Sequence, residues 1–271
     1  MYFAKNRISD MDFAEKRKAA LPIRPGLCYT ERQRRRKAGS GRRRGLFVIF
    51  GMGDDFLYHF FAMLSRMKYI NRWGLMRNTR QENICEHSLE TALIAHGLAS
   101  IGNQRFGRSY NADRAAMLAL LHDASEIITG DMPTPVKYHS EEIRQAYAEV
   151  EHGAVEHLAS MLPQELRPAY RELMTMSAPG DQELRPLVKA ADRISAIIKC
   201  VEERQSGNRD FREAEKSTLK ALEDMGLPEA EYFLQEFLPS YGLTLDEQNY
   251  STTAGVKISD SSQMFFFKAL D

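Results

Sequence analysis

The helical spacing of apolar residues constrains this chain most, because it continues with few breaks from residue 55 to about residue 247. Side chains recur there at intervals of three and four residues, which is typical of helices that bury one face. In the first two segments the recurring positions are Phe56, Phe60, Met63, Met67, Leu89, Leu93 and His96. No stretch alternates between apolar and polar residues over a useful length, and we find no internal repeat. We therefore predict an all-α domain.

Further helices are predicted along the rest of this region. One begins near Asn111 and carries Ala115, Leu118 and Leu121 on its buried face. The others are expected at about residues 140–161, 164–175, 180–205, 209–224 and 228–238. The helix at 180–205 has a stripe made of Leu184, Leu187, Val188, Ala191, Ser195 and Ile198, and Gly207 with Asn208 ends it. The segment DMPTPVKY contains two prolines, so it cannot be a helix interior and is predicted to be a loop.

The charge distribution divides the chain into two parts. Residues 1–51 contain 14 of the 37 basic and 4 of the 37 acidic residues, a net charge of +10, and the remainder therefore carries −10. Because this basic segment has no apolar period, we expect it to be disordered. A start codon set too early would also explain it, since Met52 opens the helical region. We expect one domain over residues 52–247 and a poorly ordered tail over residues 248–271.

The cysteine content and the apolar runs limit the class of protein. Cys28, Cys85 and Cys200 are scattered without CxxC spacing, so neither a disulfide framework nor a structural zinc site is predicted, and a reducing cytoplasm is the expected compartment. No apolar run approaches the roughly 20 residues of a membrane-spanning helix. We expect no membrane association.

Four residues combine metal-ligand chemistry with positions where the helical pattern predicts burial. His87 follows the start of its helix beside the expected leucine face, His122 and Asp123 end the run MLALLHD, and Asp192 interrupts LVKAADRISAIIKC. A lone buried histidine is more often a hydrogen-bonded core residue, but a carboxylate is almost never buried without a partner. Two histidines and two aspartates suit Mn²⁺, Co²⁺, Fe²⁺, Zn²⁺ or Mg²⁺. The pattern predicts one divalent metal ion.

Glu126 is the candidate general acid or base. It lies four residues after His122 and three after Asp123, which places it on the same face of a continuous helix. A carboxylate there could act on a water molecule at the metal. The alternative is a solvated carboxylate at a helix end.

The order His87, His122, Asp123, Asp192 is similar to the H…HD…D signature of the HD-domain metal-dependent phosphohydrolases. The flanking motifs INRW, EHSL, HDASE and GDMPTPVK resemble more closely the bacterial 5′-deoxynucleotidases of the YfbR type. The resemblance extends from about Phe56 to about Glu247. Chains of this family begin close to that first helix, which favours Met52 as the start.

The resemblance implies an all-α HD-domain helical bundle, usually a homodimer, that uses one divalent metal ion to remove the 5′-phosphate from deoxyribonucleoside monophosphates. It implies that His87, His122, Asp123 and Asp192 are the metal ligands, that all of these except His122 also border the substrate, and that Glu126 positions or deprotonates the attacking water. Arg72 would orient the phosphate, and Trp73 would border the sugar and leave no room for a 2′-hydroxyl. The loop residues that would contact the nucleotide are Asp131, Met132, Pro133 and Thr134.

Simpler interpretations exist for each of these residues. Arg72 could be a surface charge, Trp73 a packing or dimer-interface residue, and Asp131 the end of a helix. Another HD activity, such as a triphosphohydrolase or a cyclic-dinucleotide or alarmone phosphodiesterase, is the nearest rival function. A nucleic-acid-binding protein that acts through the basic segment is a more distant one. The sequence leaves the metal, the base preference and the oligomeric state open.

Overall fold

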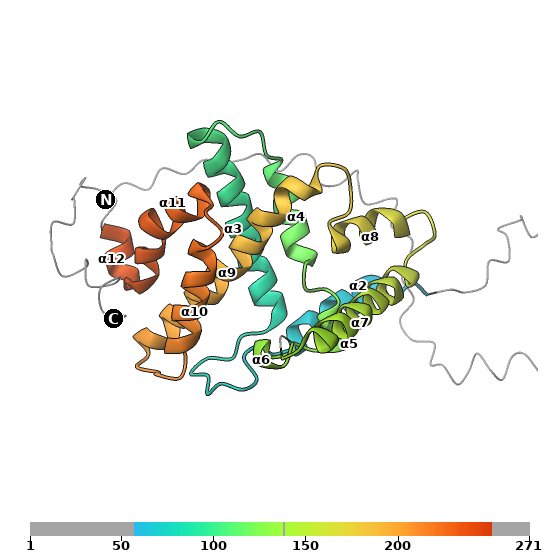
Figure 1. Ribbon diagram of the computed structural model, residues 1–271, viewed down its shortest axis with the longest axis horizontal. Coiled ribbons are helices and arrows are strands. Elements are labelled where there is room, and N and C mark those ends of the chain that lie inside the picture. Colours follow the sequence, from blue (N-terminus) through green and yellow to red (C-terminus); the bar gives the residue numbers. More distant parts are fainter. Residues whose placement is uncertain (1–56, 138, 251–271) are drawn as a thin grey trace, which may run out of the picture. The chain divides into compact units, whose positions relative to one another are not determined.

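The computed structural model describes residues 57–137 and 139–250, and every regular element within them is a helix (Figure 1). The α-helices are α2 (Phe60–Leu64), α3 (Ile84–Arg105), α4 (Ala112–Leu121), α5 (Glu126–Thr129), α6 (Thr134–Lys137), α7 (Glu141–Ser160), α8 (Arg167–Thr175), α9 (Asp181–Gln205), α10 (Arg212–Glu223), α11 (Pro228–Glu236) and α12 (Leu245–Tyr250). Two 3₁₀ helices, η3 (Ser65–Tyr69) and η4 (Leu238–Gly242), complete the set. The all-α prediction is confirmed for this part of the chain.

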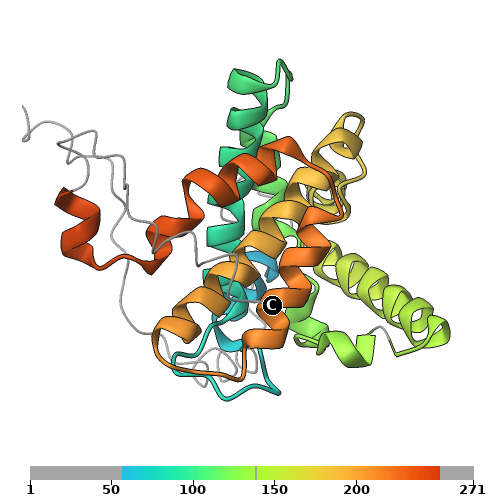
Figure 2. The ribbon, with the colours of Figure 1, turned by 60° about the vertical axis from the view of Figure 1, so that its left-hand side comes forward.

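Helices α3, α4 and α9 pack against one another in the main core (Figures 1 and 2). Their contact surfaces are rich in small residues, and Ala95, Ala99, Ala115, Ala119 and Ala191 are fully buried. Short side chains let helix axes approach closely, because little volume separates the backbones. The close approach brings the ends and middles of three helices near one another, which is where the predicted ligands lie.

The prediction that Leu89 and Leu93 mark the buried face of α3 is wrong. Both leucines are exposed, at 57% and 68%, whereas His87 and Thr91 on the opposite face are fully buried. The buried face combines small and polar residues with Ile94 and Leu98, and it lies against α4 and α9. The leucine pattern therefore indicated the wrong side of a correctly predicted helix.

A second core cluster surrounds Phe60, which is fully buried and packs edge-on against Tyr170 of α8 at 4.8 Å between ring centroids. The spacing of Phe56, Phe60, Met63 and Met67 predicts one continuous helix, but α2 covers only five residues and then tightens into η3. The Ser65 hydroxyl donates to the carbonyl of Phe61, a local bond that competes with helix continuation. Phe60 and Met67 are nevertheless buried as expected, while Phe56 lies outside the described residues.

Part of the predicted proline loop is helical. Residues 131–133 are irregular, but α6 forms one helical turn at Thr134–Lys137 with Pro135 inside it. Proline is tolerated in a first turn because the backbone N–H that it lacks has no partner there. The prediction of a loop over the whole segment is therefore wrong for these four residues.

The predicted boundaries are reproduced closely within the described residues. α9 ends at Gln205 and Gly207 follows at a φ of +79°, as expected for the glycine after a helix end. The chain is helical to Tyr250, so the first three residues of the expected tail belong to α12. Residues 1–51 and 251–271 lie outside the described residues, so disorder and a start at Met52 stay predictions.

Two smaller expectations can also be compared with the structure. Cys85 and Cys200 are free thiols, one exposed and one buried, and Cys28 lies outside the described residues. In the described part of the chain, no helix combines the length and the apolar character needed to cross a membrane.

The segment between η3 and α3 is held by a buried ion pair on α9. The side chains of Lys199 and Glu203 are 4% and 1% exposed, and Lys199 Nζ lies 2.5 Å from Glu203 Oε1. The Glu203 carboxylate accepts bonds from the backbone N–H and hydroxyl of Thr79, and the Lys199 ammonium donates to the Arg80 carbonyl. Burial opposes the charge of Glu203, but its hydrogen bonds from Lys199, Asn208 and Thr79 outweigh burial and lower its pKa to about 2.

We expect Glu203→Gln to lower the free energy of unfolding at pH 7 by about 3–5 kcal/mol, because it leaves the Lys199 charge buried without its partner. The pKa of Glu203 is lower in the folded than in the unfolded chain, so its contribution is complete above about pH 4.5 and is lost as the pH falls toward about 2. Urea denaturation across this range measures it. Exposed Glu202→Gln is the control, and an equal loss in both variants would contradict the expectation.

Candidate metal and phosphate site

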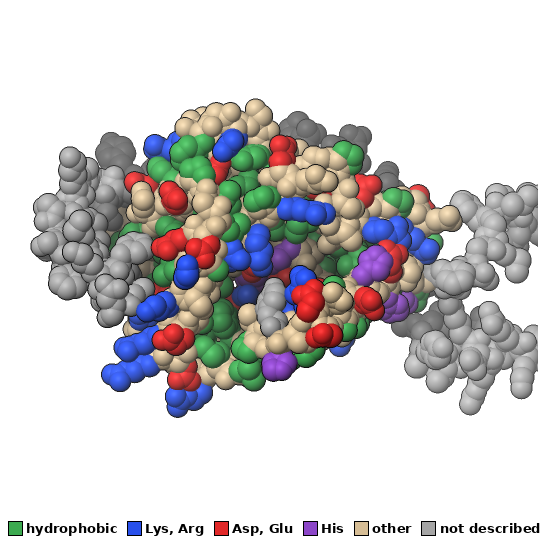
Figure 3. Space-filling view, in the orientation of Figure 1, with side chains coloured by type: hydrophobic (Ala, Val, Ile, Leu, Met, Phe, Trp, Pro, Cys, Tyr) green, Lys and Arg blue, Asp and Glu red, His purple; other side chains and the backbone are tan. Residues whose placement is uncertain are grey.

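Four side chains from three helical segments converge on one point. The Nε2 of His87 lies 3.3 Å from Asp192 Oδ1 and 3.5 Å from Asp123 Oδ2. The Nε2 of His122 lies 3.1 Å from Asp123 Oδ2 and 4.0 Å from Asp192 Oδ1. Histidine and basic side chains are visible in a hollow near the centre of one face (Figure 3). The structure therefore brings together all four residues that the sequence singled out as metal ligands.

The chain leaves the α-helical path directly after α4, and this break places His122, Asp123 and Glu126. The N–H of His122 donates to the carbonyl of Ala119, and that of Glu126 to the carbonyl of Asp123, both three residues back. In such a 3₁₀-type turn, side chains three residues apart lie above one another. The side chain of Glu126 therefore lies on the same side of the chain as that of Asp123, as predicted. The prediction assumed a continuous α-helix, which is absent here.

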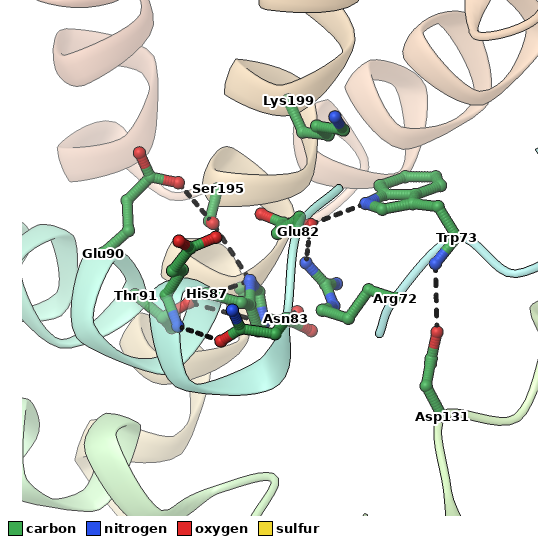
Figure 4. Close-up of polar contacts among 12 residues, drawn as sticks. Arg72, Trp73, Glu82, Asn83, His87, Glu90, Thr91, Asp131, Ser195 and Lys199 are labelled. Atoms are coloured by element: carbon green, nitrogen blue, oxygen red, sulfur yellow. Dashed lines mark hydrogen bonds and ion pairs between the residues drawn. The ribbon is translucent and has the colours of Figure 1, made fainter. Parts of the chain in front are cut away.

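Hydrogen bonds fix both imidazole rings with Nε2 toward the site. The Nδ1 of His122 lies 2.6 Å from the Ala119 carbonyl, which can only accept, so Nδ1 carries the proton. The Ser195 hydroxyl donates to the Glu90 carboxylate at 2.5 Å, so it accepts from Nδ1 of His87 at 3.0 Å (Figure 4). Each ring then has its Nε2 available as a metal ligand, the arrangement usual for histidines in metal sites.

The charges of the site favour a cation. Burial opposes protonation of His122, but Asp123 and Asp192 outweigh it and raise its pKa to about 9. Burial also opposes the charge of Asp123, yet His122 and His87 lower the pKa of this carboxyl to about 2. The Nε2 of His122 is buried without a hydrogen-bond partner. Two ionised carboxylates and two imidazole nitrogens with free Nε2 positions are a donor set that fits a divalent metal ion.

Glu126 is a buried acid rather than the solvated carboxylate of the alternative interpretation. Its Oε2 is buried without a partner. Burial, followed by repulsion from Asp123 and Asp131, raises its pKa to about 9, so it is protonated at neutral pH in the metal-free protein. A cation beside it would favour the ionised form. Such a group can exchange a proton with a neighbouring water.

Arg72 and Trp73 lie on the segment before α3, beside this cluster. Burial opposes the charge of Arg72, whose side chain is 13% exposed, but Glu82, Asp192 and Asp123 raise the pKa of its guanidinium. Trp73 has a φ of +60°, a backbone conformation that is rare for bulky residues. Strain of this kind persists only where surrounding contacts impose it. Because the Arg72 side chain is mostly buried, the interpretation of Arg72 as a surface charge is wrong.

The loop at residues 131–134 reaches the cluster through one residue. The Asp131 carboxylate accepts the backbone N–H of Trp73 at 3.2 Å (Figure 4). Met132 and Pro133 are half-buried and Thr134 is exposed, and within the described chain none of their side chains bonds to the other site residues. Tyr147 of α7 fixes the start of this loop by donating to the hydroxyl of Thr129.

Sequence reasoning missed three residues that support the site. Glu82 bonds Arg72 and Trp73, and Ser195 and Glu90 orient His87. Ser195 was assigned only to the buried stripe, although a hydroxyl within an apolar stripe and three residues after Asp192 was a usable signal. Glu82 and Glu90 carried none, because their patterns are those of ordinary polar positions. Both line a cavity of about 200 Å³ whose wall does not include the four His and Asp residues.

Comparisons with known proteins identify the family of this chain. Residues 59–241 match the family model described as 5′-deoxynucleotidase YfbR-like. The chain belongs to the YfbR-like family. The 5′-deoxynucleotidase YfbR of Escherichia coli (strain ATCC 8739) is 49% identical over 189 residues, which cover 70% of this chain and 94% of that protein.

Solved structures place the YfbR-like chain in the HD fold. An HD-domain phosphohydrolase from Listeria innocua is 26% identical with a TM-score of 0.59, and the match covers 71% of this chain and 92% of that one. A protein from Pyrococcus horikoshii, 23% identical with a TM-score of 0.50, shares the fold over 68% of this chain and 97% of its own. The predicted HD-domain fold is confirmed.

We expect Ser195→Ala to weaken metal binding by about 10–100-fold, because the ring of His87 then loses the bond that sets its orientation and its proton. Competition with a chromophoric chelator measures the affinity. Ser88→Ala is the matched control, since Ser88 is also a buried serine but its hydroxyl has no partner. Equal affinities of the two variants would contradict a supporting role for Ser195.

Proposed function

We propose that this chain is a metal-dependent 5′-deoxynucleotidase that hydrolyses deoxyribonucleoside 5′-monophosphates to a deoxyribonucleoside and phosphate. The observation that carries the proposal is the convergence of His87, His122, Asp123 and Asp192, next to Glu126 and Arg72, in a chain of the YfbR-like family. A site of this kind has a cation position, a proton carrier and an anion-binding group. Hydrolysis of a phosphomonoester needs these three parts.

The two histidines and two aspartates would hold one divalent metal ion through Nε2 and carboxylate oxygens. Such an ion supplies positive charge to the phosphate oxygens and lowers the pKa of a nearby water. Glu126 would take the proton of the attacking water, for which its buried position beside Asp123 suits it. Cobalt, manganese and magnesium are all compatible with this donor set, and the metal used in the cell stays open.

Arg72 would orient the phosphate with its planar guanidinium. Its Nη1 is bonded to Glu82, and within the described residues Nε and Nη2 make no hydrogen bond, so both are available to an anion. Trp73 would border the sugar, and the loop with Asp131, Met132, Pro133 and Thr134 would close the nucleotide side of the site. The bond from Trp73 to Asp131 supports this arrangement, because it ties the loop to the residue next to Arg72.

A homodimer, which the family resemblance implies, and a cytoplasmic location, which the cysteine content favours, stay predictions. Leu89 and Leu93, one turn apart on the exposed face of α3, are apolar residues that a second copy of the chain could cover. Binding to nucleic acid is not part of the proposal.

A phosphate-release assay across deoxyribo- and ribonucleoside mono-, di- and triphosphates tests the proposal. With added Mn²⁺, Co²⁺ or Mg²⁺, we expect deoxyribonucleoside monophosphates to have the highest kcat/KM. In the same assay His122→Ala should lose both metal and activity, whereas Glu126→Gln should keep metal while kcat falls by about 10²–10⁴-fold. Faster turnover of triphosphates would favour the rival HD activity, and loss of metal from Glu126→Gln would make Glu126 a ligand.

Trp73→Ala tests the proposed selection against ribose. A pocket rejects an added hydroxyl by denying it room or a hydrogen-bond partner, at about 1–3 kcal/mol. We expect the variant to narrow the kcat/KM ratio of deoxyribo- over ribonucleoside monophosphates by up to about 5–150-fold, mainly through better use of ribonucleotides. A folded variant with an unchanged ratio would make Trp73 a packing residue, consistent with its contact to Phe211 at 5.2 Å between ring centroids.

A further inference from the structure

One carboxylate oxygen joins the two side chains proposed to recognise phosphate and sugar. The Oε2 of Glu82 accepts from Arg72 Nη1 at 2.9 Å and from Trp73 Nε1 at 2.7 Å. Figure 4 shows the carboxylate between the guanidinium and the indole. The Glu82 side chain is 12% exposed, so water has little access to replace either bond. Bonds to a charged acceptor in such a setting are stronger than ordinary ones.

The backbone of Glu82 is bound to the same segment. Its carbonyl accepts the N–H of Arg72 at 2.9 Å, and the Ile84 N–H donates to the Ile70 carbonyl at 3.0 Å. An isolated antiparallel bridge joins Asn71 to Asn83 between these bonds. The Glu82 side chain is therefore fixed at its base as well as at its tip.

The same bridge connects this arrangement to the metal site. Asn83 caps α3 by accepting the N–H groups of Cys85 and Glu86, both at 3.1 Å. α3 then carries His87 one turn later. A displacement of Glu82 would therefore also displace the start of α3, which carries the proposed metal ligand His87.

The backbone of Trp73 has few other ways to move. Its N–H donates to Asp131, and its carbonyl accepts from the side chain of Asn78 at 3.2 Å. With φ at +60°, the indole is held by its bond to Glu82 and by packing against Phe211, and of these two contacts only the bond to Glu82 also involves Arg72. A change at Arg72 therefore reaches the indole through the shared oxygen.

We propose that Glu82 is a positioning residue that couples phosphate recognition by Arg72 to sugar recognition by Trp73, because one of its oxygens holds both side chains. This inference rests on the proposed function for the roles of Arg72 and Trp73. An anion bound at Nε and Nη2 of Arg72 competes with Glu82 for the charge of the guanidinium, so the bond from Nη1 to Glu82 weakens and the indole adjusts. A merely structural Glu82 would stabilise the loop without linking the two groups.

The fluorescence of Trp73 gives a direct test, because it is the only tryptophan in the chain. We expect inorganic phosphate, titrated into the metal-loaded full-length protein, to change the emission of the wild type. Glu82→Gln keeps the side-chain shape but offers one neutral acceptor oxygen, so the phosphate response should be lost or strongly reduced. Glu86→Gln is the matched control, since Glu86 pairs with exposed Arg80 and should keep the wild-type response.

Steady-state kinetics give a second test, because a residue that only stabilises the loop would not change KM and substrate preference more than kcat. We expect Glu82→Gln to raise KM for a deoxyribonucleoside monophosphate by about ten- to a hundred-fold with a smaller change in kcat. It should also lower the kcat/KM ratio of deoxyribo- over ribonucleoside monophosphates, although Glu82 would act on the sugar only through Trp73. Urea denaturation checks that the variant is folded.

Two results would overturn the coupling. One is a wild-type emission that phosphate at saturating concentration leaves unchanged. The other is a folded Glu82→Gln protein that keeps the phosphate response and the deoxyribose preference. Phosphate titration needs no turnover, so a protein that failed to hydrolyse deoxyribonucleoside monophosphates but kept a Glu82-dependent response would contradict the proposed substrate and not the coupling.

Discussion

The attraction between two half-buried carboxylates and a cation is the interaction on which this structure depends. Asp123 lies in the turn after α4 and Asp192 in α9, and both lie within 4.0 Å of the imidazole of His122. In the absence of a metal ion, the site meets this need by raising the pKa of His122 to about 9. A divalent ion would meet it better, because it would neutralise more charge and could bind both Nε2 atoms. The rest of the fold serves to bring these four groups together.

Supporting contacts make the arrangement rigid. The Ala119 carbonyl orients His122, and the Ser195 and Glu90 pair orients His87. Lys199 and Glu203 hold the segment that carries the proposed substrate residues. Most of these partners are polar and buried, which is costly unless every group is bonded. Their benefit is precise positioning, because a catalytic site tolerates only small errors in the placement of its groups.

The helices and the ligand set could be predicted from the sequence for local reasons. The spacing of apolar residues along the chain indicates helices. A carboxylate within an apolar helix indicates a positively charged neighbour, even when the sequence does not show which group provides the charge. The buried face of α3 could not be predicted, because leucines occur on both faces: Leu98 is buried, whereas Leu89 and Leu93 are exposed. The role of Glu126 was predicted from a continuous helix, and the 3₁₀ turn keeps it beside Asp123 by another route.

The helical class, the family and the identity of the residues that converge can be read from the sequence, since each depends on patterns within a few turns of chain. How those residues are held depends on contacts that form only in the folded chain. Glu82 meets Arg72 across ten residues, and Ser195 meets His87 across 108. Such pairs leave no local pattern, because a hydrogen bond between distant residues constrains their geometry in space and not their spacing along the chain.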